Sequence, residues 1–186
     1  MRVISGSAKG RPLKAVPGTG TRPTTDKVKE AIFSMIGPYF DGGQVLDLFA
    51  GTGGLSIEAL SRGMERAVLT DIDKKSIDII RHNLEASGFK EQAEIYRNDA
   101  VRAIKALIKR EVKFDLVFLD PPYRLKVVQD LVEQLDKANM LNEGATIVME
   151  HDTEDVYQEP IGRLHWVRRA EYGETAVTIY KYKAQD

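Results

Sequence analysis

The chain of 186 residues contains no cysteine. This absence excludes disulfide bonds, thiolate metal sites and a cysteine nucleophile, and it is compatible with a reducing cytoplasm. The three histidines, at positions 82, 151 and 165, are too scattered to suggest a set of metal ligands, so no metal is expected. No apolar run is long enough for a membrane span, and no signal-peptide pattern follows Met1. We expect a cytoplasmic protein without a membrane partner, in which residues 1–186 form one domain.

Net charge is also small, because 27 basic and 28 acidic side chains leave a formal charge of −1. The distribution is uneven: residues 1–30 have a balance of +5, from seven basic and two acidic side chains, and the other 156 residues carry −6. A basic end is typical of a segment that contacts phosphate groups, and an ordinary solvated arm has the same composition. Charge alone does not separate these two interpretations.

The N-terminal segment 3–23 is rich in glycine, proline and basic residues. Its short apolar pieces, VIS and LKAV, are able to pair as a small hairpin, and we do not expect the segment to contribute to the core. The next stretch, TTDKVKEAIFSMI, has capping candidates and apolar residues at helical spacing. This pattern predicts a helix over 26–37, which Gly37 and Pro38 end.

From residue 44 onward, short β-forming runs alternate with amphipathic stretches. The predicted strands that a helix follows are 44–49, 67–72, 93–98 and 113–120, and a fifth strand is predicted over 144–151. The last two strands, around RLHWVRRAEY and TAVTIYKYK, have no helix between them, so they should form a terminal antiparallel hairpin. The pattern predicts a Rossmann-like, doubly wound α/β fold with a mostly parallel sheet of seven strands. The single tryptophan, Trp166, is expected in the core.

A glycine-rich turn stands where such folds bind ligands, at the carboxyl end of a strand. The segment DLFAGTGGLSIEAL, residues 47–60, joins the first predicted strand to a helix. Gly51, Gly53 and Gly54 would let the backbone approach a ligand closely, because they have no Cβ atom. The free N–H groups of the helix would face the same ligand.

Two acids follow the next strands. Asp71 comes 20 residues after Gly51 and is placed to accept hydrogen bonds from both hydroxyls of a ribose. Asp99, in the segment RNDA, is placed to accept one from an adenine amino group. Helix capping is the alternative role, for Asp71 or Asp73 at one helix and for Asp99 at the next.

A glycine turn with an acid at this distance is also the pattern of NAD-binding enzymes. The chain departs from that pattern at Ser56, where the third glycine belongs, and no partner for hydride transfer is evident. A phosphate-binding P-loop matches less well, because no Gly-Lys-Ser/Thr follows the glycines. The remaining interpretation of the glycine turn is a site for a nucleoside ligand without pyrophosphate.

The segment LDPPYR, residues 119–124, ends the fourth predicted strand. Two consecutive prolines disfavour a helical conformation before them and remove two backbone donors, so the chain must leave the sheet in a rigid, extended turn. This turn would hold Asp120 and Tyr123 stiffly at the end of the strand. A simple strand terminator would have the same sequence.

The motifs DLFAGTGGLSIEAL, VLTDID, NDA and DPPY, in this order, resemble the class I S-adenosylmethionine-dependent methyltransferases that act on exocyclic amines. The segments ISGSAKGRPLKAVPG, RPTTDKVKEAIF and EYGETAVTIYK resemble the RsmD family in particular, which methylates guanine N2 in 16S ribosomal RNA. The resemblance covers essentially the whole chain. It implies the class I methyltransferase fold, S-adenosylmethionine as cofactor, and 16S rRNA in the assembled or partly assembled small ribosomal subunit as partner. No obligate protein partner is expected.

The resemblance also implies roles for residues of the cofactor site. Asp47 and the Gly51–Gly54 turn would hold the methionine part of the cofactor, Asp71 its ribose, and Asp99 with Ala100 its adenine. The residues that match the family segment closing over the methionine end are Arg22, Thr24 and Thr25.

The chemistry of an exocyclic guanine amine explains the proline turn. This nitrogen is a poor nucleophile because its lone pair is delocalised into the ring. Two acceptors on its hydrogens would pull it toward a tetrahedral shape, and the Asp120 carboxylate and the Pro121 carbonyl are able to supply them. Tyr123 would stack on the extruded base. A dedicated general base is not required, because the departing proton becomes acidic once the nitrogen is methylated.

The same resemblance makes the basic segment 1–23 an RNA-binding extension, in which Lys9, Arg11 and Lys14 contact ribosomal phosphates. Adenine-N6 DNA methyltransferases also have DPPY, but they generally carry a separate target-recognition domain, for which this chain has no room. Protein-glutamine methyltransferases usually have Asn at the position of Asp120. A non-catalytic RNA-binding or assembly module is the alternative from another class, and the intact set of acids speaks against it.

Overall fold

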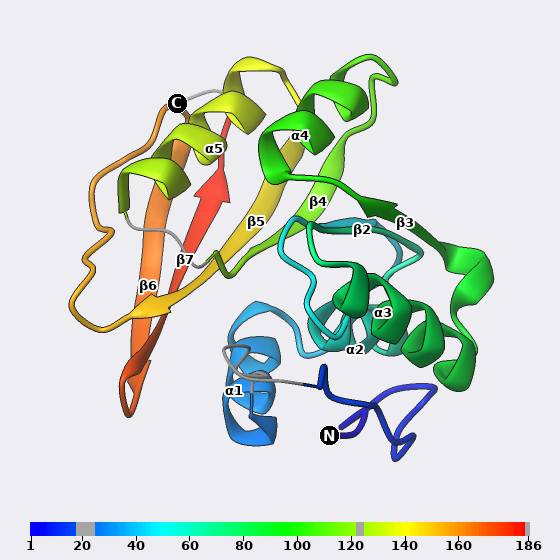
Figure 1. Cartoon of the computed structure of the whole chain (residues 1–186). Coiled ribbons are helices and arrows are strands. Elements are labelled where there is room, and N and C mark those ends of the chain that lie inside the picture. Colours follow the sequence, from blue (N-terminus) through cyan, green and yellow to red (C-terminus); the bar gives the residue numbers. More distant parts are fainter. Residues whose placement is uncertain (18–24, 122–124, 185–186) are drawn as a thin grey trace.

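A computed structural model describes residues 1–17, 25–121 and 125–184 of the chain. Figure 1 shows one twisted sheet with helices on both sides. The elements in chain order are α1 (Asp26–Ile36), β1 (Gln44–Asp47), α2 (Gly54–Ser61), β2 (Arg66–Asp71), α3 (Lys74–Ser87), the 3₁₀ helix η1 (Lys90–Gln92), β3 (Ala93–Arg97), α4 (Ala100–Ile108), β4 (Phe114–Leu119), α5 (Leu125–Lys137), β5 (Leu141–Asp152), β6 (Leu164–Tyr172) and β7 (Thr175–Tyr182).

The sheet has seven strands in the order β3-β2-β1-β4-β5-β7-β6. The first five strands of this order are parallel, and β7 is antiparallel to both β5 and β6. The predicted doubly wound sheet with a terminal antiparallel hairpin is therefore confirmed. The strand order reverses between β1 and β4, which is the position where open α/β sheets bind ligands.

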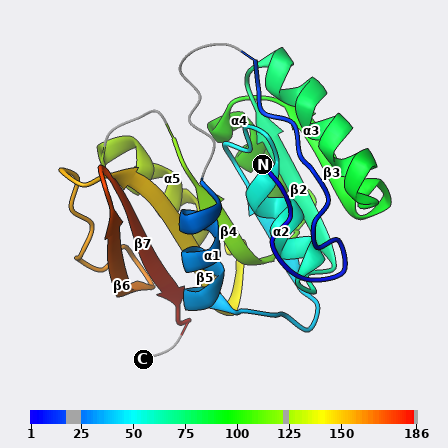
Figure 2. The same ribbon diagram turned by 90° about the horizontal axis from the view of Figure 1, so that it is seen from below.

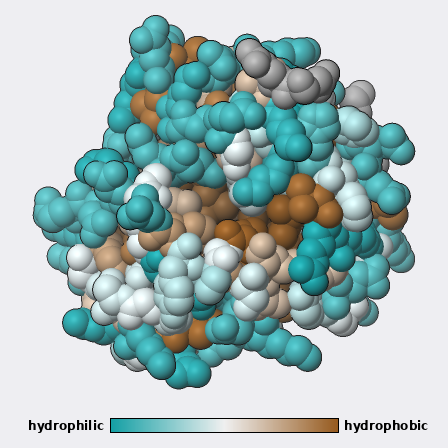
Figure 3. Space-filling view, turned by 180° about the vertical axis from the view of Figure 1, so that it is seen from behind, coloured by the Kyte–Doolittle hydropathy of each residue, from teal (hydrophilic) through white to brown (hydrophobic). Residues whose placement is uncertain are grey.

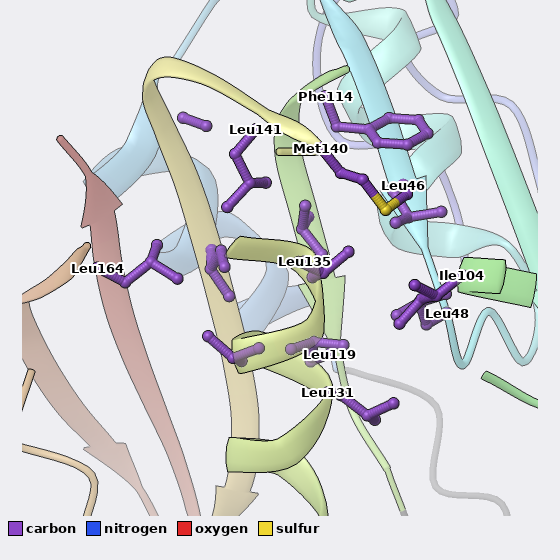
Figure 4. Close-up of a cluster of buried hydrophobic side chains, with 14 of the residues drawn as sticks. Leu46, Leu48, Ile104, Phe114, Leu119, Leu131, Leu135, Met140, Leu141 and Leu164 are labelled. Carbon is purple, nitrogen blue, oxygen red and sulfur yellow. The ribbon is translucent and has the colours of Figure 1, made fainter. Parts of the chain in front are cut away.

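Each face of the sheet has its own apolar core. Helices α4 and α5 cover one face, and α1, α2 and α3 cover the other (Figures 1 and 2). Neighbouring residues of β4 divide between the two cores: Leu119 packs on the α5 side, and Phe118 on the α1 side. Figure 4 shows Leu131 and Leu135 of α5 beside Leu119. Burial on both faces explains why β4 has an almost continuous apolar sequence instead of an alternating one.

The N-terminal segment contributes to the core, contrary to expectation. Val3, Ala8 and Leu13 are buried and pack with the apolar side chains of α1, α2 and α3. The two ends of the segment do pair, through a bridge between Arg2 and Pro12 and a hydrogen bond from the Leu13 N–H to the Met1 carbonyl. Figure 2 shows the segment running along α2 and α3. The segment is mostly polar, so its composition did not reveal the few apolar side chains that pack against the rest of the domain.

A buried carboxylate holds this segment in place. Glu58 of α2 is completely buried, and it accepts hydrogen bonds from the backbone N–H groups of Ile4 and Ser5 at 2.8 and 3.0 Å. Two buried cations neutralise it: the Arg62 Nε atom donates to it at 2.8 Å, and the Lys29 Nζ atom lies 3.5 Å away. The backbone of the N-terminal segment is thus fixed by charge-assisted hydrogen bonds inside the protein.

The position of Trp166 also differs from the prediction. Its side chain is 38% exposed, so the prediction of a core position is wrong. Trp166 lies on β6, the edge strand of the sheet, where the register with β7 shifts between Trp166 and Arg168. This shift follows Trp166, and the alternation on which the prediction rested holds up to it, so Trp166 is on the same face of the sheet as Leu164. Trp166 is partly exposed because an edge strand has a neighbouring strand on one side only.

The face of the molecule seen in Figure 3 is mainly hydrophilic. On the face seen in Figure 3, apolar side chains gather near the middle and hydrophilic ones surround them. None of the helices within residues 1–17, 25–121 and 125–184 combines the length and the apolar character that a membrane crossing needs.

Candidate active site

A pocket of about 530 Å³ opens at the carboxyl ends of the parallel strands. Its described lining contains eight carboxyl groups and two basic side chains. The acids are Asp47, Asp71, Asp73, Asp99, Asp120, Glu150, Asp152 and Glu174, and the basic residues are Lys29 and His151. Such a lining favours a ligand that carries positive charge and many hydrogen-bond donors.

The glycine turn between β1 and α2 forms one wall. Gly51 and Gly53 have φ angles of 59° and 80°, in the left-handed region that favours glycine. Gly51 and Gly54 line the pocket, whereas Gly53 caps α2 and packs against Leu69 and Ile57. A Cβ atom at Gly51 would meet no protein atom within 4 Å, so the pocket leaves room for a ligand beside this backbone.

Asp71, at the end of β2, connects the glycine turn to the next loop. One carboxylate oxygen accepts from the Gly51 N–H and the other from the Asp73 N–H, both at 2.9 Å. Asp73 is the residue that caps α3, through a hydrogen bond from the Lys75 N–H. The capping role therefore belongs to Asp73, and Asp71 stays in the pocket lining.

Asp47, at the end of β1, is 3% exposed. The Ser56 hydroxyl donates a hydrogen bond of 2.7 Å to its carboxyl group. Ser56 occupies the position where NAD-binding enzymes have a third glycine, so this departure from their pattern serves to hold the acid. The pKa of Asp47 is raised to about 7, mainly by burial and in part by the charges of Asp71 and Glu150, while the Ser56 hydrogen bond acts in the opposite direction.

This pKa makes stability depend on pH. Between the ordinary pKa of 3.8 and about 7, the unfolded chain releases the Asp47 proton while the folded chain keeps it, so the free energy of unfolding falls as pH rises. Asp47→Asn removes this pH-dependent loss of stability, and its amide oxygen still accepts the hydrogen bond from Ser56. We expect the stability of the variant relative to the wild type to be higher at pH 8 than at pH 4, by about 2–4 kcal/mol. Urea unfolding of both proteins at pH 4 and pH 8 measures these free energies. If the variant and the wild type differ by the same amount at both pH values, the prediction is contradicted.

Asp99 and Ala100 also line the pocket. Asp99 caps α4, because its carboxylate accepts from the Arg102 N–H at 2.9 Å. The acid has a second oxygen and stays partly exposed, so capping and a contact to a ligand are compatible.

Asp120 and Pro121 follow β4 and line the opposite side of the strand-order reversal. In the parallel pair of β4 and β5, Leu119 is opposite Met149, which places Asp120 beside Glu150. Burial raises the pKa of Asp120 well above its usual range, and the charge of Glu150 raises it further.

The sequence interpretation missed several lining residues, among them Ile72, Glu150 and His151. Ile72 is 63% exposed directly after Asp71, and an apolar residue just beyond the end of a buried strand was the available signal. Glu150 and His151 are the first polar residues after the apolar run of β5, the same pattern that identified Asp120. The Nδ1 and Nε2 atoms of His151 form hydrogen bonds of 2.8 Å with the Asp152 carbonyl and the Thr178 hydroxyl, and burial lowers the pKa of the ring, which favours its neutral form.

Other predicted residues lie elsewhere. Thr25 caps α1 by accepting from the Val28 N–H at 3.3 Å, and it is not in the described lining. Arg22, Thr24 and Tyr123 lie outside the described residues. Among the residues that are described, no group of three potential ligands is arranged to hold a metal ion.

The basic residues of the N-terminal segment lie on the surface. Lys9, Arg11 and Lys14 are all exposed. The Arg11 guanidinium donates to the Ala86 carbonyl at 3.1 Å, and the backbone N–H of Lys14 donates to the Asn83 side chain at 2.8 Å. The segment is therefore fixed to α3 while its charges face solvent.

The sheet order and a pocket across its reversal define a class I methyltransferase fold. A solved structure from Escherichia coli, named "Putative methyltransferase yhhF", has a TM-score of 0.84 and 30% identity and covers 100% of this chain and 99% of that one. The family described as conserved hypothetical protein 95 matches residues 1–181, and the chain belongs to this family, the RsmD family.

Two relatives illustrate the membership. "Putative rRNA methyltransferase YlbH" of Bacillus subtilis is 56% identical over 181 residues, which are 97% of this chain and 98% of the relative. "Ribosomal RNA small subunit methyltransferase D" of Escherichia coli is 30% identical over 185 residues, which are 100% of this chain and 91% of the relative. The resemblance found in the sequence motifs is thus confirmed at the level of the family.

Proposed function

We propose that this protein transfers a methyl group from S-adenosylmethionine to the exocyclic N2 amine of a guanine in 16S rRNA of the small ribosomal subunit. The observation that carries the proposal is the acidic pocket in which the glycine turn and the Asp120–Pro121 segment face each other across the strand-order reversal. The names of the relatives support an rRNA substrate.

The lining fits the cofactor. When bound, S-adenosylmethionine supplies a methyl group activated by a sulfonium cation, and an acidic pocket favours that charge. Asp47 and the Gly51–Gly54 turn would hold the amino-acid end, where Gly51 leaves open space. Asp71 would hold the ribose hydroxyls and Asp99, with Ala100, the adenine. Ile72 offers an exposed apolar surface beside Asp71 on which the adenine ring would lie.

Asp120 and Pro121 would activate the amine. Both acceptors leave β4 in one rigid turn, so their direction is set before the substrate binds, and little reorganisation accompanies the reaction. The amine hydrogens would donate to the Asp120 carboxylate and to the Pro121 carbonyl, which shifts the lone pair toward the methyl group. Tyr123 would stack on the base, as aromatic side chains do with extruded nucleotides.

Lys9, Arg11 and Lys14 would contact RNA phosphates. Their exposure and the fixed backbone of their segment support this role, because a positioned set of charges meets phosphates at a smaller loss of entropy than a free arm. Recognition of one nucleotide would then depend on RNA shape and on the extruded base.

The test uses small ribosomal subunits from a strain that lacks this protein. The purified protein is incubated with them and with labelled S-adenosylmethionine, and the RNA is digested to nucleosides. We expect label in N2-methylguanosine. Subunits from a strain that retains the protein should accept no label, because their site is already methylated. Label in another nucleoside or in ribosomal protein, or no label on subunits and naked RNA, would exclude the proposal.

A further inference from the structure

Lys29 of α1 is a buried cation in the wall of an acidic pocket. The residue is 3% exposed, and no role was predicted for it from the sequence. Eight carboxyl groups belong to the described lining, and its other basic side chain is His151, whose lowered pKa favours the neutral form. A lysine that is buried this deeply needs charged or polar partners, so its contacts show what it can bind.

The contacts of Lys29 leave it able to donate to a ligand. An ammonium group has three hydrogens to donate. Within the described part of the chain, the Lys29 Nζ atom donates to the Arg2 carbonyl at 2.7 Å and lies 3.5 Å from a carboxylate oxygen of Glu58. These two contacts account for two of the three hydrogens. One hydrogen remains for a group that enters the pocket.

The same contacts place Lys29 beside the glycine turn. Glu58 comes four residues after Gly54, so the two residues lie on the same face of α2, one turn apart. Met1 borders this corner as well, because its Cε atom is 3.7 Å from the position that a Cβ atom on Gly54 would take. Lys29 therefore lines the pocket near the first turn of α2. The amino-acid end of the cofactor is expected at this end of the pocket.

The buried charges around Lys29 do not balance. Lys29 and Arg62 are two buried cations, and Glu58 is the one buried carboxylate that they share. Glu30 approaches Arg62 at 3.6 Å and Asp26 also acts on Lys29, but both acids are exposed and water screens their charges. Burial lowers the pKa of Lys29, and an anionic ligand beside it would oppose that shift. The cluster thus favours a carboxylate at the pocket wall.

We propose that Lys29 is a further cofactor-binding residue, whose ammonium group binds the carboxylate at the amino-acid end of S-adenosylmethionine. The inference rests on the proposed function, because it takes this molecule to be the cofactor. The amino-acid end carries an ammonium group and a carboxylate. The acids of the lining suit the ammonium group and repel the carboxylate, which Lys29 offsets. Arg2 contributes indirectly, since its carbonyl holds the Lys29 side chain.

The experiment compares S-adenosylmethionine with decarboxylated S-adenosylmethionine, which keeps the sulfonium and ammonium cations and lacks the carboxylate. Titration calorimetry of the full chain measures both affinities. An acidic pocket without a partner for the carboxylate should bind the decarboxylated form more tightly, because that form carries the larger positive charge. With Lys29 as the partner, the wild type should instead prefer S-adenosylmethionine by about 10–100-fold, as expected for a hydrogen bond between charged groups.

Lys29→Gln is the decisive variant. Its amide removes the charge and keeps a donor for the Arg2 carbonyl. The preference for S-adenosylmethionine should fall by about 10-fold or more. The affinity for 5′-methylthioadenosine, which lacks the amino-acid end, should equal that of the wild type and shows that the pocket is intact. Lys27→Gln is the matched control, because Lys27 is exposed on the same helix outside the described lining, and it should keep the wild-type preference.

Two results would overturn the inference. One is a wild type that binds the decarboxylated form as tightly as S-adenosylmethionine or more tightly. The other is an unchanged preference in Lys29→Gln while 5′-methylthioadenosine binds normally. If Lys29→Gln does not fold, nuclear magnetic resonance of the wild type with ¹³C-labelled lysine decides: the pKa of Lys29 should rise more with S-adenosylmethionine than with the decarboxylated form, and an equal rise would contradict the inference.

Failure of the inference and failure of the proposed function are distinguishable. If neither S-adenosylmethionine nor its decarboxylated form binds, the proposed cofactor is wrong and the inference fails with it. If the preference depends on Lys29 but no RNA is methylated, the inference stands and only the proposed substrate fails. If RNA is methylated and the preference does not depend on Lys29, the proposed function stands without this contact.

Discussion

Asp120→Ala is expected to reduce methyl transfer to small ribosomal subunits by about 10²–10³-fold, because it removes a preorganised acceptor of the amine. The expected effect lies in the rate of the chemical step, since the proposed cofactor contacts, Asp47, Asp71 and the glycine turn, are unchanged in the pocket lining. Single-turnover kinetics with labelled S-adenosylmethionine measures the rate, and equilibrium titration measures the affinity separately.

The matched control for this variant is Asp130→Ala, which removes an exposed acid from α5 outside the described pocket lining. Its rate should equal that of the wild type. A normal rate in Asp120→Ala would show that the DPPY segment does not act on the amine. A rate reduced in proportion to weaker cofactor binding would assign Asp120 to cofactor binding instead.

Glu58→Ala is expected to lower the free energy of unfolding by about 3–5 kcal/mol, because it removes the buried carboxylate that neutralises Lys29 and Arg62 and leaves Arg62 only the exposed Glu30, at 3.6 Å. The Arg62 guanidinium donates to Glu58 at 2.8 Å, and the Lys29 ammonium lies 3.5 Å from it. The backbone N–H groups of Ile4 and Ser5 lose their acceptor at the same time. Urea unfolding measures the loss. Trypsin should also cut the N-terminal segment faster in the variant than in the wild type.

Glu85→Ala provides the comparison. Glu85 pairs with Lys90 at 3.6 Å, and both side chains are about two-thirds exposed. Loss of such a surface pair costs about 0–1 kcal/mol, because water solvates both charges when they separate. If Glu58→Ala costs no more than Glu85→Ala, the buried network does not hold the N-terminal segment to the domain.

Local patterns in the sequence were enough to predict the helices and strands and part of the candidate site. The alternation of strands and helices gave boundaries within a few residues for most elements, such as a helix over 26–37 where α1 ends at Ile36. Glycines before a helix and acids after strands identified the pocket lining at Gly51, Asp71 and Asp120. These features depend on short-range rules, namely side-chain periodicity, backbone freedom and the carboxyl ends of parallel strands.

The errors occurred where contacts join distant parts of the chain. Trp166 is partly exposed because β6 is at an edge of the sheet, and the hydrophobicity of a strand does not reveal its place in the strand order. Val3 and Leu13 are buried because Glu58, more than 40 residues away, fixes the backbone between them. Neither effect has a local signal, because the residues that cause it lie elsewhere in the sequence.

The sequence by itself therefore determined the fold class, the family and half of the acids around the pocket, since each of these follows from local patterns and motifs. Only the tertiary structure decided which acids are neighbours. Asp120 and Glu150 are 30 residues apart in the chain, and they line the same pocket as neighbours because β4 and β5 pair in one register. Register is a property of two packed strands, and a shift of one residue would have turned Glu150 to the other face of the sheet.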